Sequence, residues 1–425
     1  MHFKHYAVGG CVRDMFLGIA PKDYDYVVVG ETPESMIARG FKQVGAQFPV
    51  FLHPETNEEY ALARTEKKQG NGYHGFICDF NPTVTIVEDL FRRDLSINSI
   101  AISGEDESDI IDPYGGLQDL HDRVLRHVSH YFKDDPVRAI RLARFAARYE
   151  HLGFTIHPDT RALVKQMIAE RELDHLVPER IWEEFNKAFS HNFSGFVKYL
   201  FELGILEVIL PEVFNLHGVP QTEKYHPEVD TFVHTILCLQ QAERLYGHDG
   251  EILWAVMLHD LGKAVTPADI LPSHIHHERN GIPLVKDVCD RLKVPTSYRN
   301  LAMMVCEFHL DSHTVLTFKA STLVKRFRQY GAYRNPEQFF KFVKCCEADA
   351  RGRTGFEDRA YPQADYFLQT YEIARNVKFQ ELTNSNQIKP EHIQARLDEL
   401  RSKRINSSDV FKQRAQLKSQ ETKDV

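Results

Sequence analysis

Two acidic residues near the start of the chain have the spacing of a metal-dependent catalytic pair. Asp23 and Asp25 lie two residues apart beside the apolar run 26–29, which predicts a strand, and side chains two apart on a strand share one face. Such a pair can hold two divalent cations about 4 Å apart, which activate a hydroxyl group and stabilise a leaving diphosphate. The alternative interpretation is two solvent-facing acids on an edge strand. The residues just before the pair favour catalysis.

Those residues form a glycine turn, GGCVRD, at positions 9–14, after a short apolar strand. Gly10 lets the backbone approach a phosphate closely, and Arg13 can pair with phosphate oxygens. The motif alone is weak, because glycine pairs occur in many tight turns. Followed within a dozen residues by Asp23 and Asp25, it indicates a site that handles a nucleotide phosphate.

Two further motifs lie downstream of the acidic pair. Residues 89–98 (DLFRRDLSIN) add guanidinium groups for a triphosphate, and Asp94 and Asn98, four apart, could reach the ribose or its metal. We interpret residues 111–117 (IDPYGGL) as a turn that packs against the active strand. For that turn a structural role competes with a chemical one.

An arginine-rich helix is predicted next. Asp135 is a good N-cap, and Pro136 suits the first helical position. Four arginines then fall within about a third of the helix circumference: Arg138, Arg141, Arg144 and Arg148. A solvated stripe normally mixes acids with bases, whereas the planar fork of arginine suits phosphates and base edges. The stripe therefore predicts nucleotide binding.

A second cluster, of histidine and aspartate, lies far downstream. His234 is followed about 25 residues later by His259-Asp260-Leu261-Gly262-Lys263, which offers nitrogen and carboxylate ligands for a divalent metal. Other histidines follow: His274, His276, His277, His309 and His313. An isolated histidine is more often a satisfied core or surface residue, so the roles of His274, His276 and His313 stay open. Asp349 and Asp311 compete as a further carboxylate ligand.

The elements that must position these residues change character near residue 135. Glycine-rich turns separate four predicted strands: 6–8, 24–29, 59–63 and 97–102. Apolar residues then recur at helical spacing in four segments: 137–149, 160–169, 178–189 and 196–206. We expect a mixed α/β first part and an essentially all-α remainder. For the polar stretch 389–425 we favour a solvated helix with a frayed tail over an RNA-binding arm.

Composition sets outer limits on these expectations. A chain of 425 residues predicts two to four domains, and 43% hydrophobic with 26% charged residues is ordinary for a globular protein. No apolar run could cross a bilayer, and residues 1–10 lack the apolar core of a signal peptide. Seven scattered cysteines without a CxxC pair favour a reducing cytoplasm. The net charge of −8 decides little, because a basic stripe can lie on an acidic protein.

In this order the motifs resemble those of the class II tRNA nucleotidyltransferases, which comprise CCA-adding enzymes and bacterial poly(A) polymerases. The matching segments are GGCVRD (9–14), KDYDYVVVG (22–30), DLFRRDLSIN (89–98), IIDPYGGLQDL (110–120) and DPVRAIRLARF (135–145). Segments FPVFLHP (48–54), EEYALARTE (58–66) and VPER (177–180) bring the chain closest to the multifunctional CCA-adding branch of gamma-proteobacteria. Asp134 and Ser96 stand where that family has glutamate and threonine; the first keeps the negative charge and the second keeps the hydroxyl group.

The resemblance implies template-independent addition and repair of the 3′-terminal CCA of tRNA from CTP and ATP, with release of diphosphate. Asp23 and Asp25 would be catalytic and hold Mg²⁺. Residues implied in nucleotide binding are Gly10, Arg13, Arg93, Asp135, Arg138, Arg141 and Arg144. Among these, Asp135 and Arg138 would pair with the base edge in place of a nucleic-acid template. The long, polar, glycine-containing segment 64–85 is typical of a full CCA-adding enzyme rather than a CC-only one.

The downstream cluster resembles the HD superfamily of phosphohydrolases, which takes one metal on H…HD…D. Carried over, the ligands of a divalent transition metal, nickel being one candidate, are His234, His259, Asp260 and Asp349. His259 and Asp260 would be catalytic, and Lys263 and His277 would lie near a scissile phosphate. The implied activities are those of a phosphatase and a 2′,3′-cyclic phosphodiesterase.

The resulting expectation is an α+β chain with a polymerase-β-like head, in which helices cover a small mixed sheet. We expect the head over 1–130, an all-α neck and body over 131–225, an α-helical HD domain over 226–350 and a helical tail over 351–425. The expected partners are tRNA, CTP and ATP, with no membrane, in a cytoplasmic monomer or homodimer. One alternative is a poly(A) polymerase, although its long basic C-terminal extension is not matched here. Another is an HD phosphohydrolase with a degenerate head, against which Asp23, Asp25, Arg13 and Arg93 all count.

Overall fold

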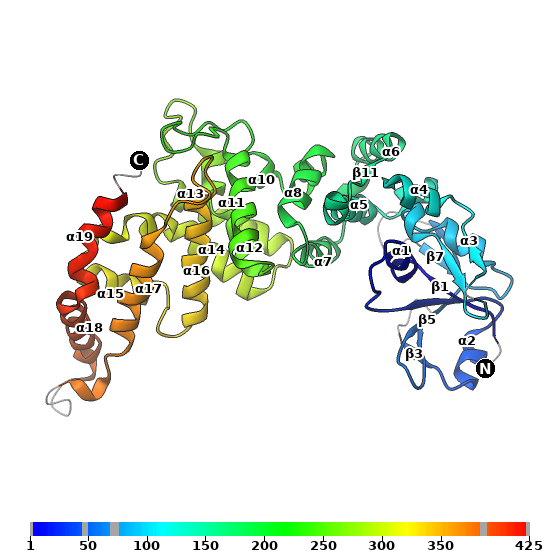
Figure 1. Ribbon diagram of the computed structural model, residues 1–425, viewed down its shortest axis with the longest axis horizontal. Coiled ribbons are helices and arrows are strands. Elements are labelled where there is room, and N and C mark those ends of the chain that lie inside the picture. The colour runs from blue at the N-terminus through cyan, green and yellow to red at the C-terminus, as the bar shows by residue number, and fades with distance from the viewer. Residues whose placement is uncertain (1–2, 45–49, 69–75, 107, 383–388, 422–425) are drawn as a thin grey trace. The chain divides into compact units, whose positions relative to one another are not determined.

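The computed structural model describes residues 3–44, 50–68, 76–106, 108–382 and 389–421. The chain divides into two compact units, one of residues 1–184 with 198–209 and the other of residues 185–197 with 210–425. A mixed sheet with covering helices characterises the first unit, whereas the described part of the second is helical (Figure 1). Among the described residues, no helix is long and apolar enough to span a membrane.

A mixed sheet organises the first unit, with strand order β3-β4-β5-β2-β1-β8-β9. Its strands are β1 His5–Val8, β2 Asp25–Val28, β3 Lys42–Val44, β4 Val50–Leu52, β5 Glu59–Leu62, β8 Ala101–Ser103 and β9 Ile110–Ile111. Strand β2 lies centrally, antiparallel to β1 and parallel to β5. Two small sheets pair β6 Thr65–Lys68 with β7 Phe76–Asp79, and β10 Val124–Leu125 with β11 Thr155–Ile156. The acidic pair therefore stands at the start of a central strand.

The two faces of this sheet bury separate cores. Val27 belongs to the core that contains Val8 and Leu90, whereas Val28 belongs to the core that contains Met36 and Phe51. This alternation follows from the two-residue period of a strand, and it assigns Asp25 to the Val27 face. The surrounding helices are α1 Gly10–Phe16, α2 Pro33–Ala38, α3 Ile86–Phe91 and α4 Gly116–Asp122. Leu90 of α3 packs in the core that contains Val27. Arg92 and Arg93, which follow this helix, therefore lie on the same side of the sheet as Asp25.

The arginine-rich helix and its neighbours complete the first unit, with α7 and α8 contributing residues to both units. They are α5 Val137–Tyr149, α6 Pro158–Ala169, α7 Pro178–Ala188, α8 Phe193–Glu202 and α9 Ile205–Ile209. Helix α5 confirms the predicted 137–149, but its N-cap position is Pro136 and not Asp135. The single helix predicted over 196–206 is wrong, because Gly204 adopts φ +76° and separates α8 from α9.

The strand predicted over 97–102 is also only partly correct. Ser96–Asn98 form a turn of 3₁₀ helix, and β8 begins at Ala101. The side chain of Asn98 donates to Asp94 and accepts from Arg13, so this segment is shaped by side-chain hydrogen bonds rather than by sheet pairing. The apolar, β-branched run 97–102 predicted a strand, but its first half forms a 3₁₀ turn.

The second unit is a stack of helices around α12 Gly250–Leu258, whose residues 252–258 are all buried. Its other helices are α10 Pro211–Phe214, α11 Thr231–Tyr246, α13 His277–Arg291, α14 Thr296–Thr314, α15 Ala320–Gln329, α16 Pro336–Arg351, α17 Pro362–Arg375, α18 Pro390–Ser407 and α19 Asp409–Glu421. Helices α18 and α19 are mostly exposed but bury Ile405 and Phe411, so the predicted tail is helical and partly packed. Residues 422–425, where fraying was expected, lie outside the described residues.

Candidate active sites

The acidic pair of the first unit lies at the open end of β2. Asp25 is the first residue of β2 and pairs with Val8, the residue directly before the glycine turn. Both Asp23 and Asp25 are exposed. Reduced hydration raises the pKa of the Asp25 carboxyl; Arg93 opposes this shift and Asp23 adds to it. Two carboxylates and one guanidinium thus lie within electrostatic reach of one another. Cations would relieve the repulsion between the two acids.

The glycine turn is pressed against Arg93. Gly9 has φ +76°, and a Cβ atom there would lie 3.1 Å from Nη1 of Arg93. Arg93 is held by Asp89, whose Oδ2 lies 3.1 Å from Nη2. Burial opposes ionisation of Asp89, but Arg92 and Arg93 lower its pKa to about 2. Glycine is therefore required at position 9, and the guanidinium is anchored above the turn.

A hydrogen-bonded chain ties other predicted nucleotide ligands together. Arg13 is buried and donates from Nη1 to Oδ1 of Asn98 at 2.7 Å. Asn98 donates to Oδ1 of Asp94 at 3.0 Å, and Oδ2 of Asp94 accepts from Nε of Arg141 at 2.9 Å. Burial raises the pKa of Asp94, but Arg141 more than offsets it, and the pKa falls below its usual range. The structure thus makes Arg13 and Asp94 parts of the framework behind the glycine turn.

The arginine stripe of α5 is paired with acids and a carbonyl from other elements. Nε of Arg144 lies 2.6 Å from Glu184, and Arg141 also approaches Glu184, at 3.7 Å. Arg138 donates from Nη1 to the carbonyl oxygen of Tyr131 at 2.7 Å. The fourth arginine, Arg148, faces Asp14 at 3.5 Å. Helix α5 itself contains no acidic residues, so the acids that pair with its arginines come from other segments of the chain: Asp14, Asp94 and Glu184.

Asp135 makes a specific ion pair, and its Oδ1 also accepts a long hydrogen bond, 3.4 Å, from the backbone N–H of Val137 at the start of α5. Its two oxygens each lie 2.8 Å from the guanidinium nitrogens of Arg180, at the start of α7. A bidentate pair of this kind fixes both side chains in orientation. Asp135 and Arg138 therefore lie on neighbouring turns but face different partners.

The segment 111–117 has the structural role that was weighed for it. Asp112 accepts hydrogen bonds from the backbone of Gly116 at 2.6 Å and Leu117 at 2.9 Å, which caps α4. A Cβ atom on Gly116 would lie 2.3 Å from the carbonyl oxygen of Ser96. The turn thus packs against the 3₁₀ segment that carries Asn98.

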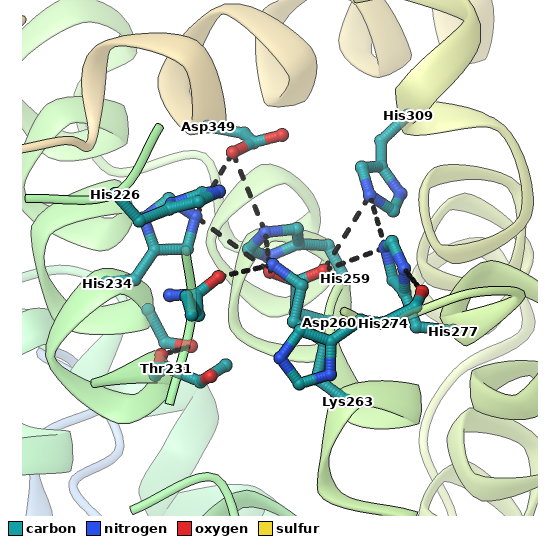
Figure 2. Close-up of polar contacts among 12 residues, drawn as sticks. His226, Thr231, His234, His259, Asp260, Lys263, His274, His277, His309 and Asp349 are labelled. Atoms are coloured by element: carbon teal, nitrogen blue, oxygen red, sulfur yellow. Dashed lines mark hydrogen bonds and ion pairs between the residues drawn. The ribbon is translucent and has the colours of Figure 1, made fainter. Parts of the chain in front are cut away.

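The second unit brings four predicted metal ligands together in its interior (Figure 2). Nε2 of His234 lies 3.2 Å from Oδ1 of Asp349 and 3.9 Å from Oδ2 of Asp260. Nε2 of His259 lies 3.1 Å and 3.8 Å from the same two oxygens of Asp260 and Asp349. Ligand atoms about 2.0–2.2 Å from one ion are spaced by roughly 3–3.6 Å, so the set fits a single divalent metal.

The state of the histidine rings supports that fit. Nδ1 of His259 donates to the carbonyl oxygen of Val256 at 2.7 Å, which leaves Nε2 as the acceptor. That Nε2 atom is buried and has no hydrogen-bond partner among the described residues. Burial opposes ionisation of Asp260, but His259, when its ring is protonated, and Lys263 bring the pKa of Asp260 well below the usual range, and a bound metal would take the place of the proton on Nε2. A buried lone pair and ionised carboxylates are a suitable donor set for Zn²⁺, Ni²⁺ or a similar ion.

The competing carboxylate, Asp311, lies elsewhere. Its Oδ2 accepts from Nε of Arg326 and from the hydroxyl of Tyr330, each at 2.9 Å. Asp349, in contrast, contacts His234 and also accepts from Nε2 of His313 at 2.7 Å. Of the two acids, the structure places Asp349 in the cluster.

Sequence reasoning missed several residues of this cluster, among them Glu228, Cys238 and His226, whose Nδ1 lies 3.1 Å from Glu228. Glu228 is buried and lies 2.9 Å from Nδ1 of His234, so it holds the ring from behind. Sγ of Cys238, one helical turn after His234, lies 3.4 Å from Nε2 of that ring. The position of Cys238 four residues after a predicted ligand was an available signal. For Glu228 the chain offered no periodic signal, because it precedes α11 in a loop.

Most of the remaining predicted residues line one cavity of about 590 Å³ beside the cluster: Lys263, His274, His277, His309 and His313. Nζ of Lys263 lies 2.6 Å from both Asp260 and Gln221. His274 is tied to Thr266 and the Pro220 carbonyl, at 2.7 Å and 3.0 Å, while His276 is exposed. Cationic residues on the cavity wall are Lys263, Arg351, Arg353 and Arg359. An anionic, phosphate-bearing molecule is the ligand that such a wall suits.

Comparisons with known proteins match three separate parts of the chain. Residues 5–126 match the model of the poly A polymerase head domain, residues 153–216 a probable RNA and SrmB-binding site of polymerase A, and residues 231–337 the HD domain. A multifunctional CCA protein of Thioalkalivibrio sulfidiphilus is 50% identical over 382 residues, 90% of this chain and 93% of its own length. One from Hahella chejuensis is 46% identical and covers 96% of both chains.

Two solved structures with a similar fold are CCA-adding enzymes. An apo form has a TM-score of 0.67 at 21% identity, covering 96% of this chain and 89% of its own. A Thermotoga maritima CCA-adding enzyme complexed with tRNA has a TM-score of 0.62 at 19% identity, covering 97% and 91%. Both similarities extend over the head and the helical remainder.

Proposed function

The chain belongs to the multifunctional CCA proteins, bacterial CCA-adding enzymes that carry an HD domain, and on that premise we propose that it completes the 3′ end of tRNA. The reaction would add C, C and A from CTP and ATP and release diphosphate. The observation that carries the proposal is the meeting of Asp23, Asp25 and Arg93 beside the Gly9 turn.

In this proposal each group of the head has a separate task. Asp23 and Asp25 would hold Mg²⁺, which supplies Lewis-acid activation of the terminal tRNA hydroxyl and neutralises the departing diphosphate. The backbone of Gly10 gives the triphosphate close access, and Arg93 is anchored to pair with its oxygens. Arg13, buried against Asn98, would position the turn. Arg141 and Arg144 would keep α5 facing the nucleotide through Asp94 and Glu184.

Asp135 and Arg138 would read the base. A carboxylate accepts from an exocyclic amino group, and a guanidinium donates to ring nitrogens and carbonyl oxygens. Cytosine and adenine both carry an amino group at the edge concerned, whereas uracil carries a carbonyl oxygen there. For this role Asp135 must exchange Arg180, and Arg138 the Tyr131 carbonyl, for the incoming base.

Purified protein with tRNA that lacks its 3′ CCA tests the proposal. We expect addition of two C residues with CTP alone, completion by A when ATP is also present, and no extension with UTP or GTP. Sequencing of the product ends separates this outcome from runs of A, which would indicate a poly(A) polymerase instead. The loop expected to govern A addition, residues 64–85, includes residues 69–75, which lie outside the described residues.

For the second unit we propose metal-dependent phosphatase and 2′,3′-cyclic phosphodiesterase activity. His234, His259, Asp260 and Asp349 would hold a divalent transition metal, with Ni²⁺ a candidate, and the metal would supply activation of water for attack on phosphorus. Lys263 and Arg353, on the cavity wall, would orient the phosphate. Release of phosphate from 2′,3′-cyclic nucleotides and from nucleoside monophosphates, with each metal in turn, tests this assignment.

The finer organisation follows from the same proposal. The proposed parts are the head over 1–130, the neck and body over 131–225, the HD domain over 226–350 and the tail over 351–425, and the neck and body contain residues of both compact units. We place the protein in the cytoplasm as a monomer or homodimer. The thiols of Cys11, Cys238, Cys289, Cys306, Cys345 and Cys346 are free, in keeping with a reducing compartment.

A further inference from the structure

The cavity beside the HD cluster is larger than a phosphate group needs. Its volume of about 590 Å³ falls in the range of sites that hold a whole small molecule, roughly 300–1,000 Å³. The residues assigned to the metal and the phosphate account for only part of its wall. Two aromatic side chains, Tyr225 and Phe356, line it as well, and the hydrolysis described above leaves them without a role.

Burial gives this cavity a floor and a mouth. Asp260, Lys263 and Asp349 are at most 6% exposed, so the groups assigned to metal and phosphate lie at its floor. Tyr225 is 56% exposed and Phe356 is half-buried, so the two rings stand nearer to the solvent. A ligand with its phosphate at the floor would therefore carry the rest of its structure past these rings.

The segments that carry the two rings are joined to each other. Tyr225 belongs to the loop before α11, which also carries Glu228. Phe356 lies in the turn after α16, where its backbone N–H donates to the Arg353 carbonyl oxygen at 2.9 Å. The N–H of Thr354, in the same turn, donates to Oε2 of Glu228 at 3.3 Å. The loop and the turn are therefore in direct contact beside the cavity.

A guanidinium group extends the aromatic surface. Cζ of Arg359 lies 4.8 Å from the centre of the Phe356 ring, and Arg359 also lines the cavity. Aromatic rings and guanidinium planes are the surfaces on which proteins stack unpaired nucleobases. Another aromatic residue of the wall, Tyr361, is bonded through its hydroxyl to Ser312 and His313, each at 3.0 Å. Phe356 and Arg359, in contrast, offer an aromatic and cationic surface near the mouth.

We propose that Tyr225, Phe356 and Arg359 form a base-stacking subsite, so that the HD domain hydrolyses phosphate esters that carry a nucleobase. The proposal rests on the proposed hydrolase function and adds a part of the substrate that this function leaves open. The ribose would link the phosphate at the floor to the base at the mouth. Stacking needs only the flat face of a base, which every base offers, so the subsite would require a base without selecting one.

The test compares two cyclic phosphates that differ only in the base. One is adenosine 2′,3′-cyclic phosphate, and the other is the 2′,3′-cyclic phosphate of methyl riboside, which keeps the ribose and the bond that is cleaved. We expect the metal-loaded full chain to hydrolyse the first with a KM about 5- to 100-fold lower, as stacking of one base supports. The cytidine, guanosine and uridine esters should stay within about tenfold of the adenosine ester.

Variants of the two rings locate the preference. Phe356→Leu keeps the apolar bulk but removes the flat ring, so it should raise the KM of the nucleotide and leave that of the riboside ester unchanged. Phe356→Tyr should retain the preference. Tyr225→Leu changes an exposed position on the other segment and should act in the same direction as Phe356→Leu. Phe379→Leu, the matched control, changes an exposed phenylalanine that is not among the lining residues and should behave as the parent does.

Calorimetry with adenosine 2′-monophosphate gives a second reading without catalysis. The parent should bind this nucleotide more tightly than Phe356→Leu and Tyr225→Leu do. If Phe356→Leu fails to fold, Tyr225→Leu tests the same claim in both measurements.

The outcomes separate this inference from the function on which it rests. Equal KM values of the parent for the two substrates would overturn the subsite and leave the hydrolase intact, and so would a preference that survives in both leucine variants. No hydrolysis of either substrate would overturn the proposed hydrolase itself. Calorimetry would then still decide the subsite, because equal binding of the nucleotide by the parent and the variants would overturn it.

Discussion

The two candidate sites of this chain are built in opposite ways. In the first unit, Asp23 and Asp25 are exposed at a strand end, and the surrounding arginines are already paired with acids of the protein. In the second, His234, His259 and Asp260 are at most 1% exposed, and they lie in contact before any ion is added. The head is thus completed by its substrates and ions, whereas the HD centre is preformed.

This difference has consequences for stability as well as for chemistry. Removing an exposed carboxylate changes the charge of a surface and little of the packing. Removing one from the buried cluster leaves histidines and Lys263 without their counter-charge, and such changes are costly.

Asp25→Asn should reduce CCA addition by at least about 10³-fold, because one carboxylate of the metal pair is lost. The thermal unfolding temperature should change little, since the side chain is exposed. Incorporation of labelled CTP and ATP into tRNA measures the first effect, and calorimetry the second. Extension at the parental rate would contradict the two-metal assignment of the head.

Asp260→Asn should reduce phosphate release from a 2′,3′-cyclic nucleotide by roughly 10²–10³-fold, because a ligand of the HD metal is neutralised. CCA addition should stay within about twofold of the parent. Here we expect a measurable loss of stability, in contrast to Asp25→Asn, because Asp260 is buried against Lys263. Hydrolysis that survives in a folded variant would return Asp260 to a purely structural role.

Glu228→Gln should weaken binding of the HD metal by roughly 10–100-fold, because the acid that orients His234 from behind becomes neutral. Competition with a chromophoric chelator measures the affinity. Glu228→Asp should restore part of it, which a loss of packing alone would not explain. Glu207→Gln, an exposed acid on α9, is the matched control and should bind metal as the parent does.

Asp135→Ala and Arg138→Ala should reduce discrimination against UTP and GTP by about 10-fold or more, since each good base contact contributes about 1–3 kcal/mol. Affinity for tRNA should change less, because phosphate contacts and not base contacts position the nucleic acid. Misincorporation and tRNA binding are measured side by side. If selectivity is unchanged in both variants, Asp135 serves only as the partner of Arg180.

Low pH should lower the stability of the first unit, because Asp89 becomes protonated. Its pKa is lowered from 3.8 to about 2 in the folded protein, so ionised Asp89 stabilises the fold above pH 4. That contribution, about 2 kcal/mol, is lost as the pH falls from about 4 to 2. Unfolding of the parent and of Asp89→Asn followed between pH 5 and 2 should converge at the acid end. Parallel curves would show that Asp89 does not titrate as described.

The same contrast explains how much could be predicted from the sequence. Close spacing along the chain predicted the neighbourhood of His259 and Asp260 after α12 and the span of α5, and it placed Asp25 on a strand, whereas Asp23 lies in a bend two residues before β2. Partners supplied by distant segments were not predictable: the arginine stripe contains no acids of its own, yet Asp94 and Glu184 meet it. Glu228 was missed for the same reason, since it approaches His234 from a loop with no periodic pattern.

Asp135 shows the limit of a local rule. Its residue type and position suited an N-cap, but a bidentate pair with Arg180, 45 residues away, takes the carboxylate. Likewise, the apolar run 97–102 has strand character, and side-chain bonds to Asn98 convert its first half into a 3₁₀ turn. In both places long-range polar contacts outweigh local preference.

The central claim, two independent chemistries on one chain, is tested most directly by a double-mutant cycle. CCA addition and cyclic phosphodiester hydrolysis are measured on single preparations of the parent, Asp25→Asn, Asp260→Asn and the double variant. We expect each substitution to abolish its own activity, and its effect to be the same in either background, with coupling below about 0.5 kcal/mol. Loss of both activities in either folded single variant would contradict the account.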